Sequence, residues 1–594
     1  MPKSESLPAL SQEELREILA CLEAGAFLPE KFRSRLFADP QGPVLLWQGK
    51  PQETRKDVHP LLVREIFCQG ETPLSPHDAR TAAWRNLLIR ADNRRLLSSL
   101  LHGPLRRFIE DQGGIKLMYI DPPFAVGADF TMPVVAPAHQ HDADRLETAE
   151  TNCGKEAASA GTLARQSVGP LRVLSYRDTW EQGLSSFLRM IHERLLLMRK
   201  LLAEDGVVYL HCDWRLAPHL RLVLDEVFGA ERFLGDIVWH YTGGGRSDRY
   251  FSRKHDRLLH YAASQRWTFN VDEVRVPYKP TSGYARSGIT SAAGRRYNPN
   301  PLGTPVDDVW DIPMVNPMSG ERLDYPTQKP EALLDRIIRA SSRPGDLVAD
   351  FFCGSGTLPA VAERAGRKWL AVDSSSLAVH ATRKRLLDCR VASPQAPAIQ
   401  PFLLAELAPE ASETTLRSQH DPEMIRHVAH FSGHSLAYYL GGIRVGHSFA
   451  DGGSVLELLG FSVSPGEDVL ANEALLRARG AKKRKNRTTE ERIAFAALLQ
   501  QDWRAWLEYW SIGLPDSGVP LAAGMASGPL CNTVVWHSAR KRKGACPDTR
   551  SPLLPLPGAW AGPKESLDLI VTIVDIFANE SRVLLRLPPD EFRY

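Results

Sequence analysis

An unusual tetrapeptide ends an apolar run at 115–120, with the sequence Asp-Pro-Pro-Phe at 121–124. The aspartate offers hydrogen-bond acceptors, the two prolines form a rigid bend, and the phenylalanine supplies a flat apolar face. An ordinary hairpin does not need this combination. The tetrapeptide predicts a loop that presents a carboxylate and an aromatic ring together to a ligand. The alternative is a proline-rich strand exit.

A second loop with chemical meaning is Asp-Phe-Phe-Cys-Gly-Ser-Gly-Thr at 350–357. Gly354 and Gly356 allow the backbone to approach a ligand closely, and Asp373 ends the next expected strand, where an acid can bind ribose hydroxyls. The loop has neither the GxGxxG pattern nor a Walker lysine, so it favours a nucleoside cofactor over a pyrophosphate. The alternative is a tight strand-to-helix turn.

Strands and helices alternate around both loops. Apolar periodicity predicts a helix from 180 that stops at Asp205-Gly206, a strand at 207–213, and a second helix that ends at Gly229. This alternation predicts an α/β fold with a doubly wound, mostly parallel sheet. Ligands bind outside the carboxyl ends of the strands in such sheets, so the two loops are expected to face one crevice.

Length and composition set further bounds. At 594 residues the chain exceeds what one core supports, so roughly two to four domains are expected. A net charge of +3 neither indicates nor excludes a polyanionic partner. The eight cysteines form no CxxC pair or zinc-type group, which favours reduced thiols and no metal. A polar N-terminus and the lack of a long apolar run predict a soluble, cytoplasmic protein.

Shifts in composition divide the chain into domains. Residues 1–83 form an N-terminal arm, with a helix capped by Ser11 and a strand within 43–50. Residues 84–233 and 321–394 carry the α/β pattern, and 131–170 form an aperiodic insertion that could act as a lid. An inserted region at 234–320 contains short strands, including one at 266–274, and 395–594 form a C-terminal domain with a β-rich end.

The two loops together resemble the catalytic motif [DNS]PP[YFW] and the cofactor motif FxGxG of amino-group DNA methyltransferases. The order of the motifs, catalytic first, resembles the permuted β class, which includes the modification subunits of type III restriction systems. Five further stretches are similar to this family, and the match covers roughly 84–390. They are NLLIRADN, YRDTW, VVYLHCDW, FSRKHDRLLHY and YPTQKP. Ala91 stands where the family usually has glycine.

The resemblance implies a Rossmann-like domain that transfers a methyl group from S-adenosylmethionine to the exocyclic amine of a flipped base. Such an amine is conjugated with its ring and lies out of reach inside a duplex, so the base must leave the stack. Asp121 and the carbonyl of Pro122 are expected to accept hydrogen bonds from the amine, and Phe124 to stack on the base. The implied catalytic residues are Asp121, Pro122, Pro123 and Phe124.

The resemblance also assigns cofactor residues and partners. The implied cofactor-binding residues are Asp92, Thr327, Lys329, Asp350, Phe352, Gly354, Gly356, Thr357 and Asp373. Asp92 would lie near the adenine, although an Asp-Asn pair is equally typical of a turn. The implied partners are double-stranded DNA, a restriction or helicase subunit in another chain, and a second copy in a homodimer. The aspartate of the tetrapeptide favours adenine N6, with cytosine N4 and a non-catalytic DNA-binding subunit as alternatives.

Cations interleaved with aromatic residues in TGGGRSDRYFSRKHD predict a DNA contact, at the place where the β class carries a target-recognition insertion. The residues expected to bind DNA are Arg246, Arg249, Arg253 and Lys254. A solvated loop is the alternative. Basic runs at 482–487 and 540–543 could add phosphate contacts, and HCDW at 211–214 is expected to line a pocket rather than bind a metal.

Overall fold

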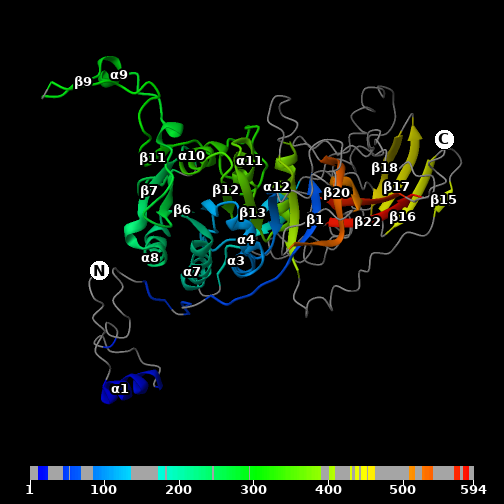
Figure 1. The fold of residues 1–594 in the computed structure, drawn as a ribbon, viewed down its shortest axis with the longest axis horizontal. Coiled ribbons are helices and arrows are strands. Elements are labelled where there is room, and N and C mark those ends of the chain that lie inside the picture. Colours follow the sequence, from blue (N-terminus) through cyan, green and yellow to red (C-terminus); the bar gives the residue numbers. More distant parts are fainter. Residues whose placement is uncertain are drawn as a thin grey trace.

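The structure, a computed structural model, describes most of residues 84–388 and shorter segments on either side (Figure 1). The described residues are 11–23, 32, 45–47, 49–51, 54–67, 84–134, 171–180, 183–243, 246–292, 294–388, 400–408, 428–430, 435–440, 443–450, 453–461, 507–515, 525–539, 567–575 and 580–587. The expected insertion from residue 135 onward and the basic runs at 482–487 and 540–543 lie outside them.

Six neighbouring parallel strands form the centre of a large sheet, which confirms the predicted fold class. Their order is β6 (Leu202–Cys212), β3 (Ile115–Ile120), β12 (Leu347–Asp350), β13 (Lys368–Asp373), β2 (Asn86–Arg90) and β14 (Phe402–Leu407). All four residues of β12 are buried, because a parallel sheet is covered on both faces.

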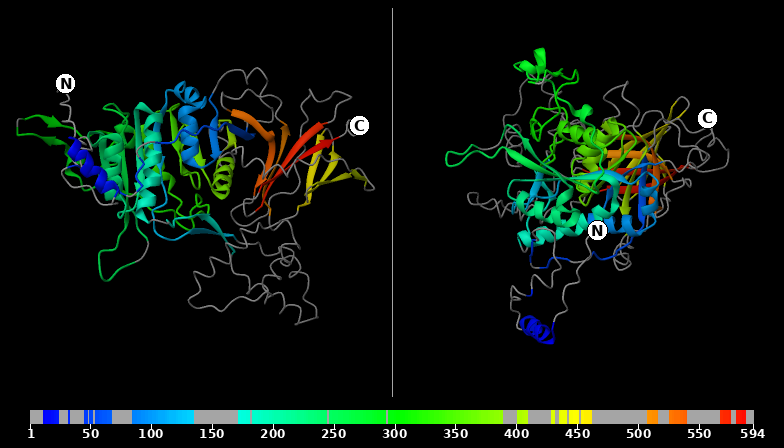
Figure 2. Two further views of the ribbon diagram at one scale, coloured as in Figure 1. Left: turned by 90° about the horizontal axis from the view of Figure 1, so that it is seen from below. Right: turned by 60° about the vertical axis from the view of Figure 1, so that its left-hand side comes forward.

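Helices cover both faces of this sheet (Figures 1 and 2). The helices of one face share a hydrophobic core and are α3 (Asn93–His102), α4 (Leu105–Glu110), α7 (Leu184–Leu201) and α8 (Ala217–Phe228). Those of the other face share a second core and are α10 (Glu331–Ser341), α11 (Thr357–Arg364) and α12 (Ser376–Asp388). The helix expected to reach Asp205 ends at Leu201, because β6 begins at Leu202. Gly229 caps the C-terminus of α8, as predicted.

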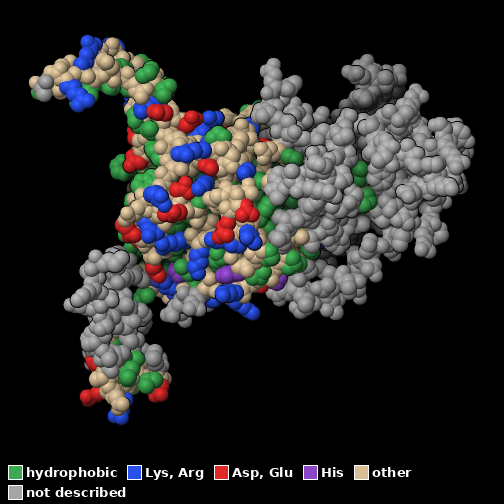
Figure 3. Space-filling view, viewed as in Figure 1, with side chains coloured by type: hydrophobic (Ala, Val, Ile, Leu, Met, Phe, Trp, Pro, Cys, Tyr) green, Lys and Arg blue, Asp and Glu red, His purple; other side chains and the backbone are tan. Residues whose placement is uncertain are grey.

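Three strands extend the sheet beyond β6, namely β8 (His255–Ala262), β7 (Phe233–His240) and β11 (Val309–Asp311). Apart from Phe233, they fall within the range 234–320 that was expected to be an insertion, and the remaining described residues of that range leave the sheet. The strand expected at 266–274 is absent there, and its last residues form the 3-10 helix η2 (Val271–Val274). A projecting arm follows, with α9 (Gly283–Ser287), β9 (Ile289–Thr290) and β10 (Arg296–Tyr297) (Figure 1). Lys and Arg side chains gather on the arm (Figure 3).

At the opposite edge, strands from the N-terminal and C-terminal parts of the chain pair with the sheet. Strand β1 (Leu61–Phe67) pairs antiparallel with β14 and parallel with β20. The strands beyond it are β20 (Met525–Ala539), β19 (Leu507–Pro515), β21 (Leu567–Asp575) and β22 (Glu580–Leu587). A separate sheet contains β15 (Val428–His430), β16 (Ser435–Leu440), β17 (Ile443–Ala450) and β18 (Gly453–Phe461). The C-terminal segment is therefore rich in strands, as predicted.

The N-terminal predictions have mixed outcomes. Helix α1 (Gln12–Glu23) begins with a reciprocal cap, in which the Glu14 N–H donates to Ser11 Oγ and the Ser11 N–H donates to Glu14 Oε2. The strand expected within 43–50 is wrong for its described residues, which are irregular and turn at Gly49. Strand β4 (Phe130–Val134) pairs with β5 (Leu171–Tyr176) at the base of the expected insertion. Among the described helices, none has the length and apolar character to cross a membrane.

Candidate active site

The two loops singled out in the sequence leave adjacent strands. Asp350, the last residue of β12, pairs in register with Tyr119 of β3, so both chains emerge side by side at the carboxyl edge of the sheet. A cavity of about 630 Å³ joins them, a volume typical of small-molecule sites. The predicted site residues that line it are Asp92, Asp121, Pro122, Pro123, Phe124, Thr327, Lys329, Asp350, Phe352, Gly354, Thr357 and Asp373.

The carboxylate of Asp121 is held from two sides. The ammonium of Lys329 lies 2.6 Å from Asp121 Oδ2, and Nδ1 of His211 lies 3.8 Å from Oδ1. The same ammonium lies 5.4 Å from the centre of the Phe124 ring. The carboxylate, the lysine and the aromatic ring therefore form one unit directly after the C-terminal end of β3. The Asp121 side chain is 17% exposed to solvent.

A buried polar chain supports Asp121 from behind. Tyr119 Oη lies 2.8 Å from His211 Nδ1, and His211 Nε2 lies 3.2 Å from Asp256 Oδ2. Tyr241 donates to the other oxygen of Asp256. Burial, and then the charge of Asp121, raises the pKa of Tyr119 well above its usual value, so this phenol stays protonated. Within the described residues no group of side chains could hold a metal ion, and His211 lies behind the cavity wall rather than on it.

The bend after Phe124 depends on a residue that the sequence argument missed. Ala125 has a positive φ of 50°, a costly conformation for a residue with a side chain. Asp178, fully buried, accepts hydrogen bonds from the N–H groups of Ala125 and Val126 at 2.8 and 2.9 Å and from the indole of Trp180 at 3.1 Å. The signal was present in YRDTW, where an acid two residues before a tryptophan precedes a helix.

The cofactor-type loop is organised by Asp373. Its Oδ2 accepts from the N–H of Gly354 at 3.0 Å, and its Oδ1 accepts from the N–H of Ser375 at 2.9 Å. Burial raises the pKa of Asp373, while these backbone donors lower it. Gly354 has a φ of +49°, and a Cβ there would lie 3.2 Å from the ring of Tyr325. A side chain in place of Gly354 would narrow the cavity between this loop and Tyr325.

Asp350 lies deeper, at the end of β12. The side chain is buried, and Oδ1 accepts from the N–H of Phe352 at 2.9 Å. Burial raises the pKa of Asp350 well above its usual value, and the charges of Asp121 and Asp373 act in the same direction. Asp350 also lines the cavity, so its carboxyl places a polar group there.

Gly356 and Thr357 are structural at this site. Gly356 does not line the cavity, and a Cβ on it would lie 2.6 Å from Thr382 of α12, so its missing side chain allows α11 and α12 to pack closely. Thr357 is buried, donates from Oγ1 to the carbonyl of Lys329 at 3.1 Å, and accepts from Arg385 at 2.9 Å. Thr357 thus fixes the backbone that carries the lysine.

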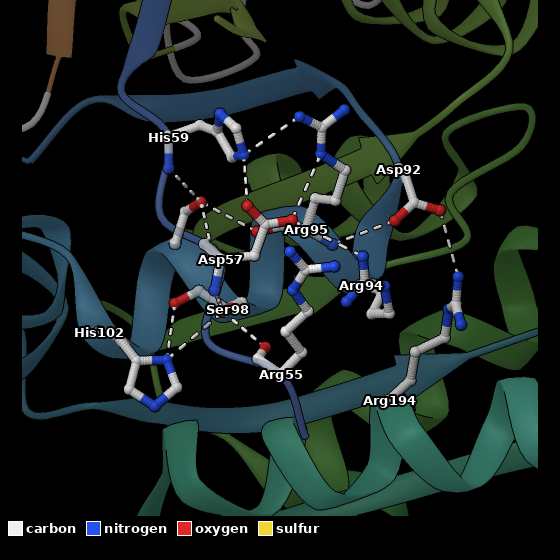
Figure 4. Close-up of polar contacts among 10 residues, drawn as sticks. Arg55, Asp57, His59, Asp92, Arg94, Arg95, Ser98, His102 and Arg194 are labelled. Carbon is white, nitrogen blue, oxygen red and sulfur yellow. Dashed lines mark hydrogen bonds and ion pairs between the residues drawn. The ribbon is translucent and has the colours of Figure 1, made fainter. Parts of the chain in front are cut away.

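Two predicted residues border the cavity from other elements. Asp92 caps α3 by accepting from the N–H of Arg95, and its Oδ2 lies 3.2 Å from Arg194 of α7 (Figure 4). Thr327 has a positive φ of 60°, and its hydroxyl lies 3.2 Å from the Tyr176 hydroxyl of β5. Thr327 therefore connects the YPTQKP segment with the β4–β5 pair across the cavity.

The four residues expected to bind DNA lie on the loop between β7 and β8 and do not line the cavity. Strand β7 is antiparallel to β8, which is antiparallel to β6, so this loop emerges at the same edge as the two site loops. Arg253 lies over the rings of Trp214 and Tyr250 at 3.9 and 4.7 Å. Lys254 donates to the carbonyl of Gly243, and Arg246 and Arg249 are exposed.

The residues around the cavity fit a nucleoside cofactor. A glycine allows close backbone approach, Asp373 supplies acceptors held in place by two backbone amides, and Phe352 supplies an aromatic face. Asp121 and Phe124 occupy the other end of the same cavity. The fold and this cavity define the class as a doubly wound α/β domain that binds a nucleoside cofactor beside an acid–aromatic loop.

Comparison with known proteins gives the family. Residues 115–384 match a family model described as DNA methylase, of the N6/N4 type. DNA adenine methyltransferase YhdJ of Escherichia coli strain K12 is 31% identical over 211 residues, which cover 35% of this chain and 69% of that protein. The chain belongs to this family of amino-group DNA methyltransferases, whose members use S-adenosylmethionine.

For two other relatives, the match spans less than two thirds of the relative's own length. Type II methyltransferase M.HpaI of Haemophilus parainfluenzae is 32% identical over 205 residues, covering 34% of this chain and 60% of that protein. The Mod subunit of the type III restriction-modification enzyme EcoP15I of Escherichia coli is 25% identical over 261 residues, covering 42% of this chain and 36% of that subunit. The resemblance to type III modification subunits is thereby confirmed.

Proposed function

We propose that this protein transfers a methyl group from S-adenosylmethionine to the exocyclic amine of a flipped DNA base, with adenine N6 as the target. The observation that carries the proposal is the shared cavity, in which the acid and ring of the 121–124 loop face the 351–357 loop from the adjacent strand. A base amine and a cofactor nucleoside can be held there at the same time.

The residues of the tetrapeptide would bind and orient the base. Phe124 offers its ring for stacking, a contact of about 1–3 kcal/mol per base in comparable platforms. Asp121 and the carbonyl of Pro122 would accept the two hydrogens of the amine, which draws the nitrogen toward tetrahedral geometry and frees its lone pair. Asp178 and the two prolines keep these acceptors in place. S-adenosylmethionine, when bound, supplies an electrophilic methyl group on a sulfonium.

Lys329 has a more specific role in this proposal. Its ammonium donates to Asp121 and lies over Phe124, so it occupies the place that a stacked amine would take. The ammonium pairs with the carboxylate and aims it at the cavity, because a partly buried anion without a partner is costly. An incoming base amine would share or replace this hydrogen bond, since a carboxylate accepts about four.

The remaining cofactor contacts follow from the loops. Asp373 would bind ribose hydroxyls, and Phe352 would pack on the adenine with Asp92 at its rim. Gly354 would allow the backbone to approach the cofactor closely. Asp350, Thr327 and Thr357 would line the part of the cavity that holds the methionine group of the cofactor. Gly356 would contribute through the packing of α11.

DNA would approach the carboxyl edge of the sheet. The loop with Arg246, Arg249, Arg253 and Lys254 lies there, and Phe251 at its tip is 99% exposed. The arm adds cations, because residues 275–306 contain five lysines or arginines and no aspartate or glutamate, although Arg275 pairs with Asp272 at 2.6 Å. Both belong to the proposed recognition region at 234–320, and both suit a phosphate backbone.

Adenine is favoured over cytosine by the aspartate at position 121, and the Escherichia coli relative YhdJ is named a DNA adenine methyltransferase. A cytosine-N4 enzyme is the second candidate, because the family model covers both amines. We place the protein in the cytoplasm as the modification component of a restriction or defence system, with double-stranded DNA as substrate. A restriction or helicase subunit and a second copy of the chain are its proposed protein partners.

Transfer of a labelled methyl group to DNA, followed by nucleoside analysis, tests this function. N6-methyladenine in the product is the expected result. N4-methylcytosine would support the second candidate. DNA binding without transfer would mean that the chain is a non-catalytic subunit that retains the fold.

A further inference from the structure

A second cavity, next to the candidate active site, is lined mainly by arginines. Its volume is about 590 Å³, and it lies between Pro51, Thr54 and Arg55, the start of α3 and the part of α7 at 186–197. Four arginines line it, and Glu193 is the single carboxylate among the lining residues that the structure describes. We name this cavity the arginine cleft, after the four arginines that line it, Arg55, Arg94, Arg189 and Arg194.

The outer wall of the cleft is attached firmly to α3. The N–H of Asp57 donates to Ser98 Oγ at 2.8 Å, and the N–H of His59 donates to Ser99 Oγ at 3.0 Å. Both serines are buried in α3, so the segment at 55–59 is hydrogen-bonded to this helix (Figure 4). The cleft is therefore a built feature of the fold, in which a part of the N-terminal arm forms one side.

The acids near the cleft do not neutralise it. Asp57 is shared between the side chain of His59 at 2.5 Å and the guanidinium groups of Arg94 and Arg95, each at 3.6 Å. Asp92 pairs with Arg194, and Glu193 pairs with Arg189 at 3.4 Å. The four arginines of the cleft thus face three carboxylates, one of which, Asp57, is also shared with Arg95 and His59.

Arg55 is the cation left over. Within the described part of the chain it has no ion pair, and its side chain lies beside those of Asp57 and Arg94 in Figure 4. Guanidinium groups remain charged at neutral pH, and their planar fork matches the oxygens of a phosphate. An excess of positive charge built from arginine favours a phosphate ligand.

The position of the arginine cleft indicates which kind of phosphate it binds. Arg194 and Met190 line both cavities, so the cleft opens directly beside the cavity of the candidate active site. Helices α3 and α7 both begin at the carboxyl edge of the sheet, where a flipped base would enter. The side chain of Arg189 is 58% exposed, which suits a ligand that stays in contact with solvent, such as a nucleic-acid backbone.

We propose that the arginine cleft binds backbone phosphates of the DNA strand next to the flipped base. This inference rests on the proposed function and adds a contact surface on the opposite side of the cavity from the recognition region. The N-terminal arm would then act in DNA binding, because its segment at 51–59 forms a wall of the cleft.

The test uses Arg55→Gln, Arg189→Gln and the double variant of the full-length protein. Binding to a labelled DNA duplex is measured over a range of salt concentrations. Each lost phosphate contact should lower the slope of log K against log salt by about 1 and weaken binding equally for different sequences. Cofactor affinity should stay unchanged, because neither residue lines the cofactor cavity.

Arg266→Gln is the matched control, because Arg266 is 73% exposed and pairs with Glu204 at the beginning of β6, on the opposite edge of the sheet. The control should keep the wild-type slope. Thermal unfolding shows that each variant is folded, and Arg55→Lys should restore most of the slope as a cation of similar reach.

Two outcomes would overturn the inference. One is a double variant that keeps the wild-type slope and affinity. The other is a nucleoside triphosphate that binds the wild type but not the double variant, while DNA binding is equal in both; the cleft would then serve a free nucleotide. If the wild type neither binds nor methylates DNA, the proposed function fails instead, so the two failures are distinguishable.

Discussion

The ammonium of Lys329 lies 2.6 Å from Asp121 Oδ2, although 208 positions, the difference of the two residue numbers, separate them in the chain. The lysine is held from behind, because its carbonyl accepts from Thr357 and its ammonium also donates to the carbonyl of Thr327 at 3.2 Å. The acid of one loop and the cation of another therefore form a single charged unit over Phe124.

Replacement of Lys329 by methionine should lower kcat by about 10²-fold, because the carboxylate loses the partner that aims it and small misplacements at a reacting centre are costly. Cofactor affinity should change little. Single-turnover methylation and calorimetric titration with the cofactor measure the two effects. Lys329→Arg is the control that keeps the charge. A pure loss of cofactor affinity with normal kcat would contradict this role.

Asp121→Asn should reduce methyl transfer by about 10²- to 10³-fold, the range seen when one preorganised polar contact to a reacting group is removed. The amide keeps the size of the carboxylate but brings its own N–H donors toward an amine that also donates. Cofactor binding should persist. Equal activity of wild type and variant would mean that Asp121 does not accept from the base.

Asp178→Ala should disorder the loop that carries Asp121 and Phe124, although Asp178 itself would not contact the base. The change removes the acceptor of the N–H groups of Ala125 and Val126 and of the Trp180 indole, and each of these partly buried hydrogen bonds contributes about 1 kcal/mol. We expect a lower kcat/KM together with a lower unfolding temperature. Asp129→Ala is the nearby control, since half-buried Asp129 accepts from the Thr179 hydroxyl and the Asp178 N–H, and its loss leaves the Asp178 carboxylate in the sequence. A variant with wild-type kcat/KM would refute the positioning role.

Glu65→Gln should destabilise the junction between the N-terminal, catalytic and C-terminal segments. Glu65 on β1 is fully buried and lies 2.7 Å from Arg383 of α12, which stacks over Tyr509 of β19 at 4.2 Å. Loss of one partner of a buried pair costs about 3–5 kcal/mol. Chemical unfolding with a double-mutant cycle against Arg383→Met isolates the coupling. Independent unfolding of a C-terminal unit, with no coupling, would contradict a shared core.

His260 should make the protein less stable in acid. Burial lowers the pKa of His260 from its usual 6.5 to about 3, and the ring stacks on Tyr209 at 3.9 Å. Between these two pH values the unfolded chain binds a proton that the folded chain does not, so stability falls as pH falls from 6.5 toward 3, by up to about 1.4 kcal/mol per pH unit.

The measurement for His260 is the free energy of unfolding against pH. His260→Phe, which keeps a ring against Tyr209, should reduce the slope by about one proton in this window. His102→Phe, at a partly exposed position on α3, serves as the control and should leave the slope nearly unchanged. An unaltered slope in His260→Phe would show that other groups set the acid sensitivity.

Local features were predictable from the sequence because they depend on near neighbours. Strand β3 and the bend at Asp121, the glycine loop after β12, the cap at Ser11 and the end of α8 at Gly229 each follow from a few adjacent residues. The convergence of the two loops was also predictable, because parallel strands present their carboxyl ends at one edge.

Contacts between distant segments were decided by the tertiary structure. Nothing near Lys329 in the chain indicates that its ammonium reaches Asp121, and nothing near Asp178 indicates that it caps the bend after Phe124. Strand β1 pairs with β14 and β20 because its unpaired backbone edge meets theirs in the fold, so both ends of the chain extend one sheet. Sequence patterns set which faces are apolar and which turns are tight, whereas packing and backbone pairing decide which of those faces and edges meet.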